Sequence, residues 1–439
     1  MKGRLPSGAS LLILIPAQPS AECKKAAEVL AGELRARIAL DVHLREQCAV
    51  EAFDSFDLLI QLGTLHTLPD ELLEQIDPPL KIAPYPDYNE HVNLRILCGR
   101  PARILIAAGS DRALIYGVGM LFRFFHFKDD EMLWELAPTD FQPLTPLRGC
   151  FFQAGLPQDG YSRFSFGQWD HLLNDQALWG NNLAGWDSTL ATPDLLDSAR
   201  SHAQKTLHFS TGGDAMDSMQ ADYCCLQESS SDPSIMSFYE SLKRLTSQKS
   251  SSPQNHSRHK PEWWIHADGW SEDELSELFD AMILDSPPAA KAVSCSESNQ
   301  CFAMIKQEMP LTTPLVSLYT FSSSFSPDVL ARRYFELAPL TYGALAVSSA
   351  PGDELARFAW SMLSWSPQPA ADEITALYAH RYFGAAAVED FQQAVSNLPE
   401  CSQKTLDLFS QAQKNAPARM QRYAKQKQRI IINRINSFQ

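Results

Sequence analysis

Four acidic residues directly follow runs that read as buried β-strands. They are Asp187, Asp214, Asp268 and Glu297, and Glu308 is a weaker fifth. Two carboxyl groups held on either side of a bond can act as general acid and as nucleophile or base. Cleavage of a glycosidic bond needs such a pair about 5 to 9.5 Å apart. We take the first four as candidate catalytic residues without assigning roles among them.

Side chains beside these acids are candidate sugar-binding residues. Trp186 directly precedes Asp187, and the segment EWWIHADGW places His266 and Trp270 around Asp268. Small-molecule sites are commonly lined by aromatic side chains together with a few oriented polar groups. We therefore expect Trp186, His266 and Trp270 to contact the substrate.

Each candidate also has a purely structural interpretation. Asp187 precedes Ser-Thr and can form a turn, while Asp214 can stabilise its own Gly-Gly-Asp turn. Asp268 can be a turn acid in the same way. A histidine or tryptophan within an apolar run is commonly part of a core. The sequence leaves both interpretations open for every one of these residues.

Other classes of site find little support. The sequence has no His-Glu-x-x-His, His-x-His, Asp-x-Asp or Gly-x-Ser-x-Gly motif, so we expect no metal, no cofactor and no serine nucleophile. Gly117 and Gly119 fall inside an expected helix, where they permit close packing and do not form a phosphate loop. Nine cysteines without a Cys-x-x-Cys motif predict reduced, buried thiols. The adjacent Cys224 and Cys225 leave a strained disulfide as the alternative.

The first of the acids closes a strand–helix–strand unit. Cys150–Phe152 is a short apolar run, and Asn182–Trp186 begins a second strand. Between them Ser165 can cap a helix that continues to Trp179, where Gly180 ends it. A unit that places an acid just past its second strand is typical of active sites in (β/α)8 barrels.

Alternation of strands and helices continues to about residue 365. Further strands are expected at Leu207–Thr211, Trp263–Ala267, Ala292–Cys295, Leu315–Tyr319 and Ala344–Val347. Helices are expected at Pro193–Gln204, Pro233–Leu245, Glu272–Leu284, Pro327–Glu336 and Asp353–Ser364. This order predicts a parallel sheet with crossover helices, and seven strands favour a closed barrel. The polar segment 246–260 does not fit, and it indicates either an insertion or a missing unit.

Four regions are expected along the chain. Residues 1–128 predict a small α/β domain, a sheet with helices on one face, whose first strand is Leu11–Ile15. Residues 129–147 read as a connector, 148–368 as the barrel and 369–439 as a helical region. The apolar run Leu11–Ile15 is short for a signal peptide, which leads us to expect a cytoplasmic location.

The charge balance limits the range of partners. The net charge of −15, from 37 basic and 52 acidic side chains, argues against nucleic acid or an anionic membrane as partner. No apolar run approaches the roughly 20 residues of a membrane span. Seven basic residues follow Asp407 with no acid among them: Lys414, Arg419, Arg422, Lys425, Lys427, Arg429 and Arg434. We expect this basic helix to be solvated or to pack on the acidic body, with contact to a partner as the alternative.

Three segments resemble glycoside hydrolases that join an N-terminal α/β domain to a TIM barrel, as β-hexosaminidases and α-glucuronidases do. They are GSDRALIYGVGMLFRFF, the Arg148-Gly149 pair with the later ALWGNN, and residues 348–384. The resemblance implies hydrolysis of glycosidic bonds in oligosaccharides by carboxylate acid/base catalysis, as in polysaccharide degradation. In the enzymes it resembles, an acid usually stands near the position of Ser348, Ser349 and Ala350. That departure favours the alternative, a catalytically impaired barrel that binds carbohydrate or acts as a scaffold.

The expected fold class is therefore α/β. A small N-terminal α/β sandwich domain is followed by a (β/α)8-type (TIM) barrel, regular or irregular, and by a helical C-terminal extension. The expected partner is a carbohydrate substrate, and the sequence leaves the oligomeric state open.

Overall fold

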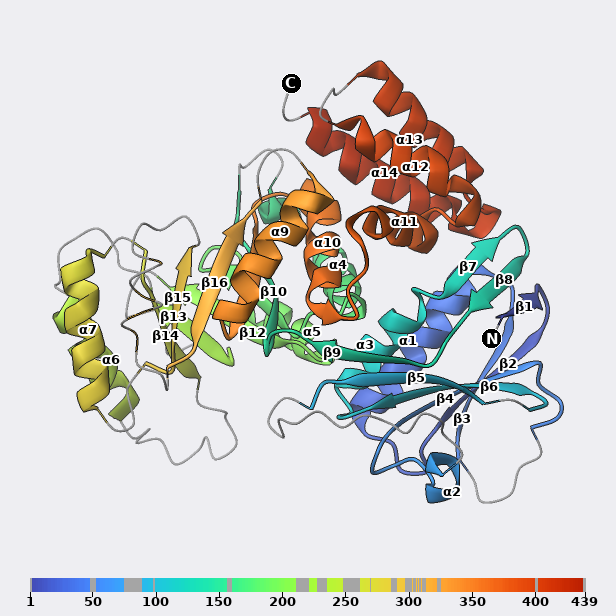
Figure 1. The fold of residues 1–439 in the computed structure, drawn as a ribbon, viewed down its shortest axis with the longest axis horizontal. Helices are drawn as coiled ribbons and strands as arrows, with labels where there is room; N and C mark the ends of the chain where they lie inside the picture. The colour runs from blue at the N-terminus through green and yellow to red at the C-terminus, as the bar shows by residue number, and fades with distance from the viewer. Residues whose placement is uncertain are drawn as a thin grey trace.

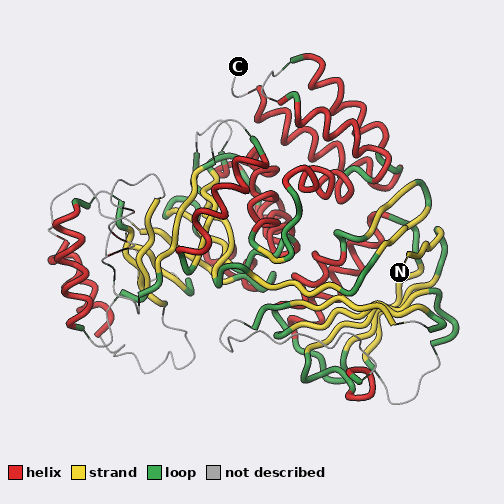
Figure 2. Tube along the Cα trace, in the orientation of Figure 1, coloured by secondary structure: helices red, strands yellow, loops and turns green. Residues whose placement is uncertain are grey.

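The chain forms three parts in sequence order: a sheet domain, a central barrel and a group of C-terminal helices (Figure 1). The computed structural model describes residues 2–47, 53–74, 89–97, 99–155, 160–210, 221–226, 235–247, 261–268, 270–285, 290–296, 302, 305, 307, 309, 313–321, 325–398 and 402–436. Within these residues, no helix combines the length and the hydropathy that a membrane span needs. The strands gather in two separate groups, and the C-terminal region is entirely helix and loop (Figure 2).

The N-terminal domain is built on a seven-stranded sheet in the order β18-β9-β5-β6-β4-β2-β3. Its strands are β2 (Ser10–Ile15), β3 (Asp41–Glu46), β4 (Leu58–Thr64), β5 (Val92–Leu97), β6 (Ala102–Ala108), β9 (Thr139–Pro143) and β18 (Trp365–Ser366). Helices α1 (Ala21–Arg37) and α3 (Ala113–Leu121) share a core with Ile104 and Ile106 on one face. The short α2 (Asp70–Leu73) packs through Leu72 on the opposite face. The expectation of helices on one face is corrected: both faces are covered, as in a sandwich.

Residues 129–147, expected to be a connector, contain two strands. β8 (Glu131–Glu135) forms an antiparallel three-stranded sheet with β1 (Lys2–Pro6) and β7 (Phe125–Lys128). β9 joins the main sheet beside β5. Met132 and Trp134 of β8 are buried, whereas Glu131, Leu133 and Glu135 are more exposed. This alternation is typical of a strand with one covered face. The prolines of this segment lie at strand ends and in turns, which is why they suggested a connector.

Eight parallel strands close into a barrel, because β17 pairs with β10. They are β10 (Leu147–Phe152), β11 (Leu183–Asp187), β12 (Lys205–Ser210), β13 (Tyr223–Leu226), β14 (Glu262–His266), β15 (Ala292–Ser296), β16 (Leu315–Thr320) and β17 (Gly343–Ser348). The barrel helices that this part of the chain shows are α4 (Phe166–Leu178), α5 (Pro193–Ser201), α6 (Ile235–Ser247), α7 (Glu272–Leu284), α9 (Pro327–Leu337) and α10 (Glu354–Leu363). The closed barrel is confirmed.

No unit is missing near 246–260. β13 supplies the strand that the sequence did not predict, and α6 (Ile235–Ser247) is the helix expected at Pro233–Leu245. The polar segment 248–260 lies outside the described residues. The four residues of β13, Tyr-Cys-Cys-Leu, are too few to display a strand periodicity of their own. They are recognised as a strand only through their pairing with β12 and β14.

Side chains of the barrel strands alternate between the interior and the surface that faces the helices. One buried cluster draws on all the barrel strands and therefore fills the interior; it includes Phe151, Cys225 and Trp264. Phe152 and Trp186 occupy the intervening positions and pack with Trp169 of α4. This alternation decides which side chains of a strand can reach the barrel mouth.

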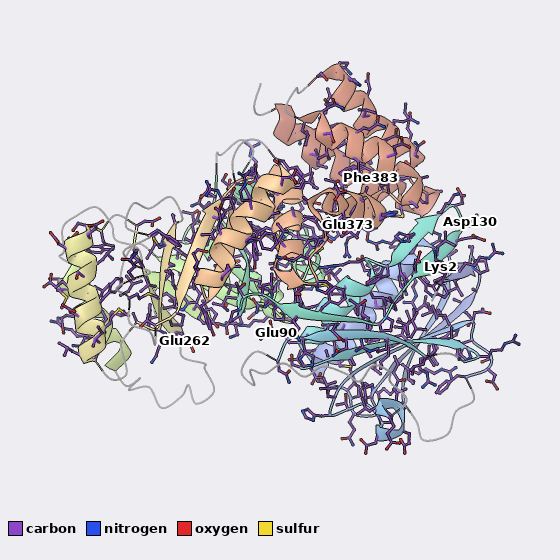
Figure 3. All side chains as sticks on the ribbon, viewed as in Figure 1. Lys2, Glu90, Asp130, Glu262, Glu373 and Phe383 are labelled. Carbon is purple, nitrogen blue, oxygen red and sulfur yellow. The ribbon has the colours of Figure 1, made fainter. Side chains whose placement is uncertain are left out.

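The junction of the first two parts relies on one arginine and one glycine. Arg148 Nη2 lies 2.6 Å from Oε2 of Glu90 (labelled in Figure 3) in the N-terminal domain, and both side chains are buried. Gly119 of α3 lies against α4, so closely that a Cβ there would stand 1.6 Å from the carbonyl oxygen of Leu178. Gly117 of the same helix packs on Ile106 and Val92 of the sheet, which confirms the expected close packing of helix on sheet, whereas Gly119 packs on a helix.

The C-terminal region consists of α11 (Ala371–Tyr382), α12 (Val388–Ser396), α13 (Gln403–Asn415) and α14 (Gln421–Asn436). α14 docks on the barrel through Lys427, which is 2% exposed. Its Nζ lies 2.7 Å from Oδ2 of Asp175 in α4 and 2.8 Å from Oε1 of Glu354 in α10. This member of the basic run therefore packs on the acidic body, as expected.

Candidate active site at the carboxyl end of the barrel

The carboxyl ends of β14 and β15 bring a histidine and a carboxylate together. His266 ends β14 and is 5% exposed, and the side chain of Asp268, two residues later, is 27% exposed. His266 Nε2 lies 3.2 Å from Asp268 Oδ2. His266 shares the inward face of β14 with Trp264, and its ring contacts that of Phe209 edge-on, with centroids 5.4 Å apart. The pair therefore lies at the interior mouth of the barrel.

Neighbouring strands hold both members of this pair. Ser294 Oγ lies 3.1 Å from His266 Nδ1 and 3.2 Å from Cys225 Sγ. Burial raises the pKa of the Cys225 thiol, so it is a neutral group that can donate to Ser294. The serine hydroxyl can then donate to Nδ1, which leaves Nε2 as the imidazole atom that donates to Asp268.

Asp268 is anchored from β15 as well. Its Oδ1 accepts a 3.0 Å hydrogen bond from the backbone N–H of Ser296, and the Ser296 hydroxyl donates to Oδ2. A carboxylate that accepts from two hydrogen-bond donors and an imidazole is fixed in position. It remains partly open to solvent, so a substrate at the mouth can reach it.

Asp187 has a different setting. Its Oδ1 accepts hydrogen bonds from Thr189 N at 3.0 Å, Thr189 Oγ1 at 2.6 Å and Leu190 N at 3.2 Å. Its Oδ2 accepts from Ala154 N at 2.7 Å and so ties the segment after β10 to the turn after β11. In this structure Asp187 is a turn-forming residue at the barrel mouth.

Trp186 and Trp270, which the sequence analysis expected to contact the substrate, are core residues in the structure. Trp186 is fully buried beneath α4, because its position on β11 points outward from the barrel. Trp270 is 5% exposed and packs among the side chains of α6 and α7. Neither ring offers a face to a ligand at the mouth. Asp214, Glu297 and Glu308 lie outside the described residues.

The end of the last barrel strand carries a rigid polar cluster. Ser348 Oγ lies 2.7 Å from the Tyr161 hydroxyl and 3.1 Å from Asp353 Oδ2. Arg357 donates from Nη1 to Ser348 Oγ at 2.8 Å and to the Tyr161 hydroxyl. Asp353 also accepts from Ala350 N at 3.2 Å, so its carboxylate shapes this loop.

Sequence reasoning identified the acid and the histidine but not their supports. The position of Asp268 just past a strand was a usable signal. Ser294, Ser296 and Cys225 gave no such signal, because short polar residues within a strand are common. Only the pairing of the strands brings Ser294 to His266, Ser296 to Asp268 and Cys225 to Ser294. Tyr161 and Arg357 were likewise missed, since they are 196 residues apart in the chain.

Comparisons with known proteins reveal a shared fold without detectable sequence kinship. No protein-family model matches the sequence, and no curated protein matches it. Among solved structures, a family GH115 4-O-methyl-α-glucuronidase aligns with 98% of this chain and 73% of its own, at 9% identity and a TM-score of 0.64.

Two further glycoside hydrolases align over most of the chain. A GH138 enzyme targeting pectin rhamnogalacturonan II covers 93% of this chain and 71% of its own, at 11% identity and a TM-score of 0.57. The chitobiase of Flavobacterium johnsoniae covers 93% and 72%, at 10% identity and a TM-score of 0.55. The chain thus has a glycoside-hydrolase-like architecture, which matches the expected fold.

Proposed function

We propose that this protein hydrolyses glycosidic bonds of oligosaccharides at the carboxyl end of its barrel. The observation that carries the proposal is the Asp268–His266 pair, held from three neighbouring strands at the mouth of a closed parallel barrel. In such barrels, polar residues at the carboxyl ends of strands carry the chemistry. The structural neighbours that are glycoside hydrolases make a sugar the best supported substrate class.

Asp268 fits the role of the carboxylate that stays ionised. Hydrogen-bond donors that include Ser296 N, Ser296 Oγ and His266 Nε2 point at it, and such donors stabilise an anion. It would act as base or nucleophile, and His266 would position it from below. The general acid would come from Asp187, Asp214 or Glu297.

Glu228 joins that set of candidate acids because of the corrected strand assignment. β13 ends at Leu226, so Glu228 follows a barrel strand by two residues in the sequence. Glu228 was not a candidate from the sequence, because no strand was predicted at Tyr223–Leu226. Glu228 itself lies outside the described residues, and its candidacy rests on sequence position alone.

The alternative function is carbohydrate binding without catalysis. It is favoured by Ser348, Ser349 and Ala350, which place no acid directly at the end of β17. The hydrogen bonds that occupy both oxygens of Asp187 support it too, because they give that carboxylate a structural task.

The deciding experiment measures hydrolysis of aryl N-acetylhexosaminides and glucuronides, then of natural oligosaccharides. The variants are Asp268→Asn, His266→Gln, Asp214→Asn, Glu228→Gln and Glu297→Gln. Loss of an acid or base should lower kcat/KM by about 10²–10⁴ with folding intact by circular dichroism. Asp273→Asn is the matched control, since Asp273 is an exposed acid on α7 a few residues beyond Asp268.

The outcomes separate the two functions. If Asp268→Asn abolishes turnover and Asp273→Asn does not, the hydrolase proposal and the assigned site both stand. If no substrate is turned over by the unmodified protein while calorimetry detects sugar binding, the hydrolase proposal fails and the binding function replaces it.

A further inference from the structure

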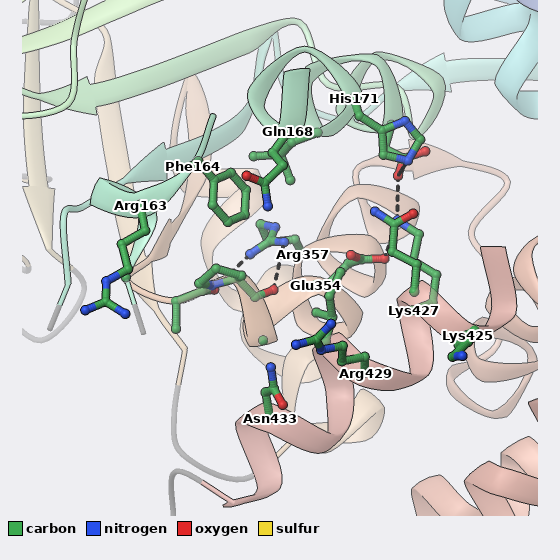
Figure 4. A pocket seen from close by; sticks show the side chains of 18 of the residues that line it. Arg163, Phe164, Gln168, His171, Glu354, Arg357, Lys425, Lys427, Arg429 and Asn433 are labelled. Carbon is green, nitrogen blue, oxygen red and sulfur yellow. Dashed lines mark hydrogen bonds and ion pairs between the residues drawn. The ribbon is translucent and has the colours of Figure 1, made fainter. Parts of the chain in front are cut away.

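A hollow lies beside the barrel, and its lining contains neither Asp268 nor His266. It is a pocket of about 720 Å³ between the start of α4, the loop after β17 and one side of α14 (Figure 4). Its size is within the range of about 300–1,000 Å³ that small-molecule sites occupy. Arg163 comes from the loop side, and Lys425, Arg429 and Asn433 come from α14.

The lining of this pocket is strongly basic in a protein that carries a net charge of −15. Its acidic side chains, Asp175 and Glu354, are both committed to Lys427, at 2.7 and 2.8 Å. Arg357 is committed to the cluster around Ser348. The buried charged side chains of the lining therefore already have ion-pair or hydrogen-bond partners within the protein.

Four further cations on the pocket walls are not neutralised in this way. They are Arg163, Arg422, Lys425 and Arg429. Each is exposed, and none forms an ion pair with a carboxylate among the described residues. Three come from α14 at positions 422, 425 and 429, which a helix brings to one side. The basic run of the C-terminal sequence is thus divided: Lys427 docks the helix, while its neighbours line the pocket.

Like charges that converge on a concave surface raise the local positive potential and concentrate anions there. Guanidinium groups present planar forks of N–H donors that match the oxygens of phosphate and sulfate. Gln168, Gln426 and Asn433 add uncharged amide donors to the same lining. The pocket therefore combines charge, directional donors and sufficient volume.

We propose that this pocket is a second ligand site, which takes a small organic polyanion such as a phosphorylated or sulfated sugar. Because its lining contains neither Asp268 nor His266, binding at this site requires no catalytic activity. The acidic character of the whole chain disfavours an extended nucleic acid as the ligand.

The test uses the full chain and isothermal titration with myo-inositol hexakisphosphate, sucrose octasulfate and neutral sucrose. Binding of the two polyanions, but not of sucrose, is expected, and it should weaken as salt rises. The pocket variant is Arg422→Gln with Arg429→Gln. We expect its Kd for the tighter polyanion to rise at least about tenfold.

The matched control removes the same number of charges elsewhere in the C-terminal helices. Lys404→Gln with Lys414→Gln changes two exposed lysines of α13 that are outside the pocket lining. Its Kd should stay within about twofold of the unmodified protein. Equal weakening in both variants, or no polyanion binding by the unmodified protein at about 1 mM, would overturn the proposal. Preference for one polyanion over the other would identify the oxyanion that the site reads.

Discussion

Replacing Lys427 by alanine should strongly destabilise the protein. The amine is 2% exposed, and its two carboxylate partners, Asp175 and Glu354, are each 3% exposed. Burial opposes the charged amine, yet Asp175 and Glu354 together raise the pKa of Lys427 above its ordinary value. The structure therefore holds one buried cation between two buried anions.

The size of the effect follows from what remains after the amine is removed. Tyr382 donates to Asp175 at 3.0 Å and Tyr378 donates to Glu354 at 2.6 Å, but the close ion pairs with Nζ are lost. His171 Nε2 lies farther away, 3.9 Å from Asp175 Oδ2. Breaking a buried ion pair by removing one partner costs about 3–5 kcal/mol. For a urea dependence of about 2–3 kcal/mol per molar, the unfolding midpoint should fall by about 1–2 M.

The assay is urea unfolding followed by tryptophan fluorescence and far-ultraviolet circular dichroism. A chain of several parts can unfold in steps, so the relevant transition is the one that includes the C-terminal helices. Lys425→Ala, an exposed neighbour on α14, is the control and should stay within about 0.5 kcal/mol. Replacing Lys427, Asp175 and Glu354 together by Met, Asn and Gln should restore much of the loss.

Acid provides a second check with a defined sign. Although burial favours its neutral form, the nearby charge of Lys427 holds the pKa of Asp175 below its ordinary value. The pair therefore stabilises the folded protein at neutral pH and loses that contribution only in strong acid. In Lys427→Ala, Asp175 lacks the cation and accepts a proton more readily, so the stability deficit of this variant should shrink between pH 7 and 5. A deficit below about 1 kcal/mol at pH 7 would refute the reasoning.

Three other outcomes are expected. Gly119→Ala should lower the free energy of unfolding by at least about 1–3 kcal/mol in chemical denaturation, because its Cβ would lie 1.6 Å from the Leu178 carbonyl oxygen. The control is Gly32→Ala, which should be neutral or stabilising because a Cβ there would meet no atom within 4 Å. Burial, and to a lesser extent His126, lower the pKa of His380 to about 4. The free energy of unfolding should therefore decline by roughly 2 kcal/mol as pH falls from about 6.5 to 4. Thermal melts of His380→Gln should depend less on pH over this range. Asp187→Ala should lower the free energy of unfolding by about 1–3 kcal/mol, because the turn after β11 loses its hydrogen bonds to this carboxylate. Thermal unfolding measures the change, and an unchanged melting temperature would contradict a structural role for Asp187.

Local signals in the sequence were sufficient for most elements. Ser165 caps α4 and exchanges hydrogen bonds with Gln168 as a capping box, so the helix begins where its cap predicts. The helix at Glu272–Leu284 has the expected bounds as well. These features depend on residues only a few positions apart, and the chemistry of such neighbours is written in the sequence.

Tertiary structure decided the remaining questions. β13 is a strand because it pairs with β12 and β14. Trp186 is a core residue because its side chain lies on the outward face of β11. The register of three strands brought Ser294 to His266, Cys225 to Ser294 and Ser296 to Asp268. Lys427 and Arg429 share one basic run, yet one is buried between carboxylates and the other lines a pocket.

The physical reason is the range over which each interaction acts. Capping, helix periodicity and turn formation are settled within a few residues, so the sequence by itself determined most of the elements and the barrel class. Burial, ion pairing and the assembly of a site depend on residues from separate strands and helices. Only the folded chain decides which of two similar side chains is enclosed and which remains free to meet a ligand.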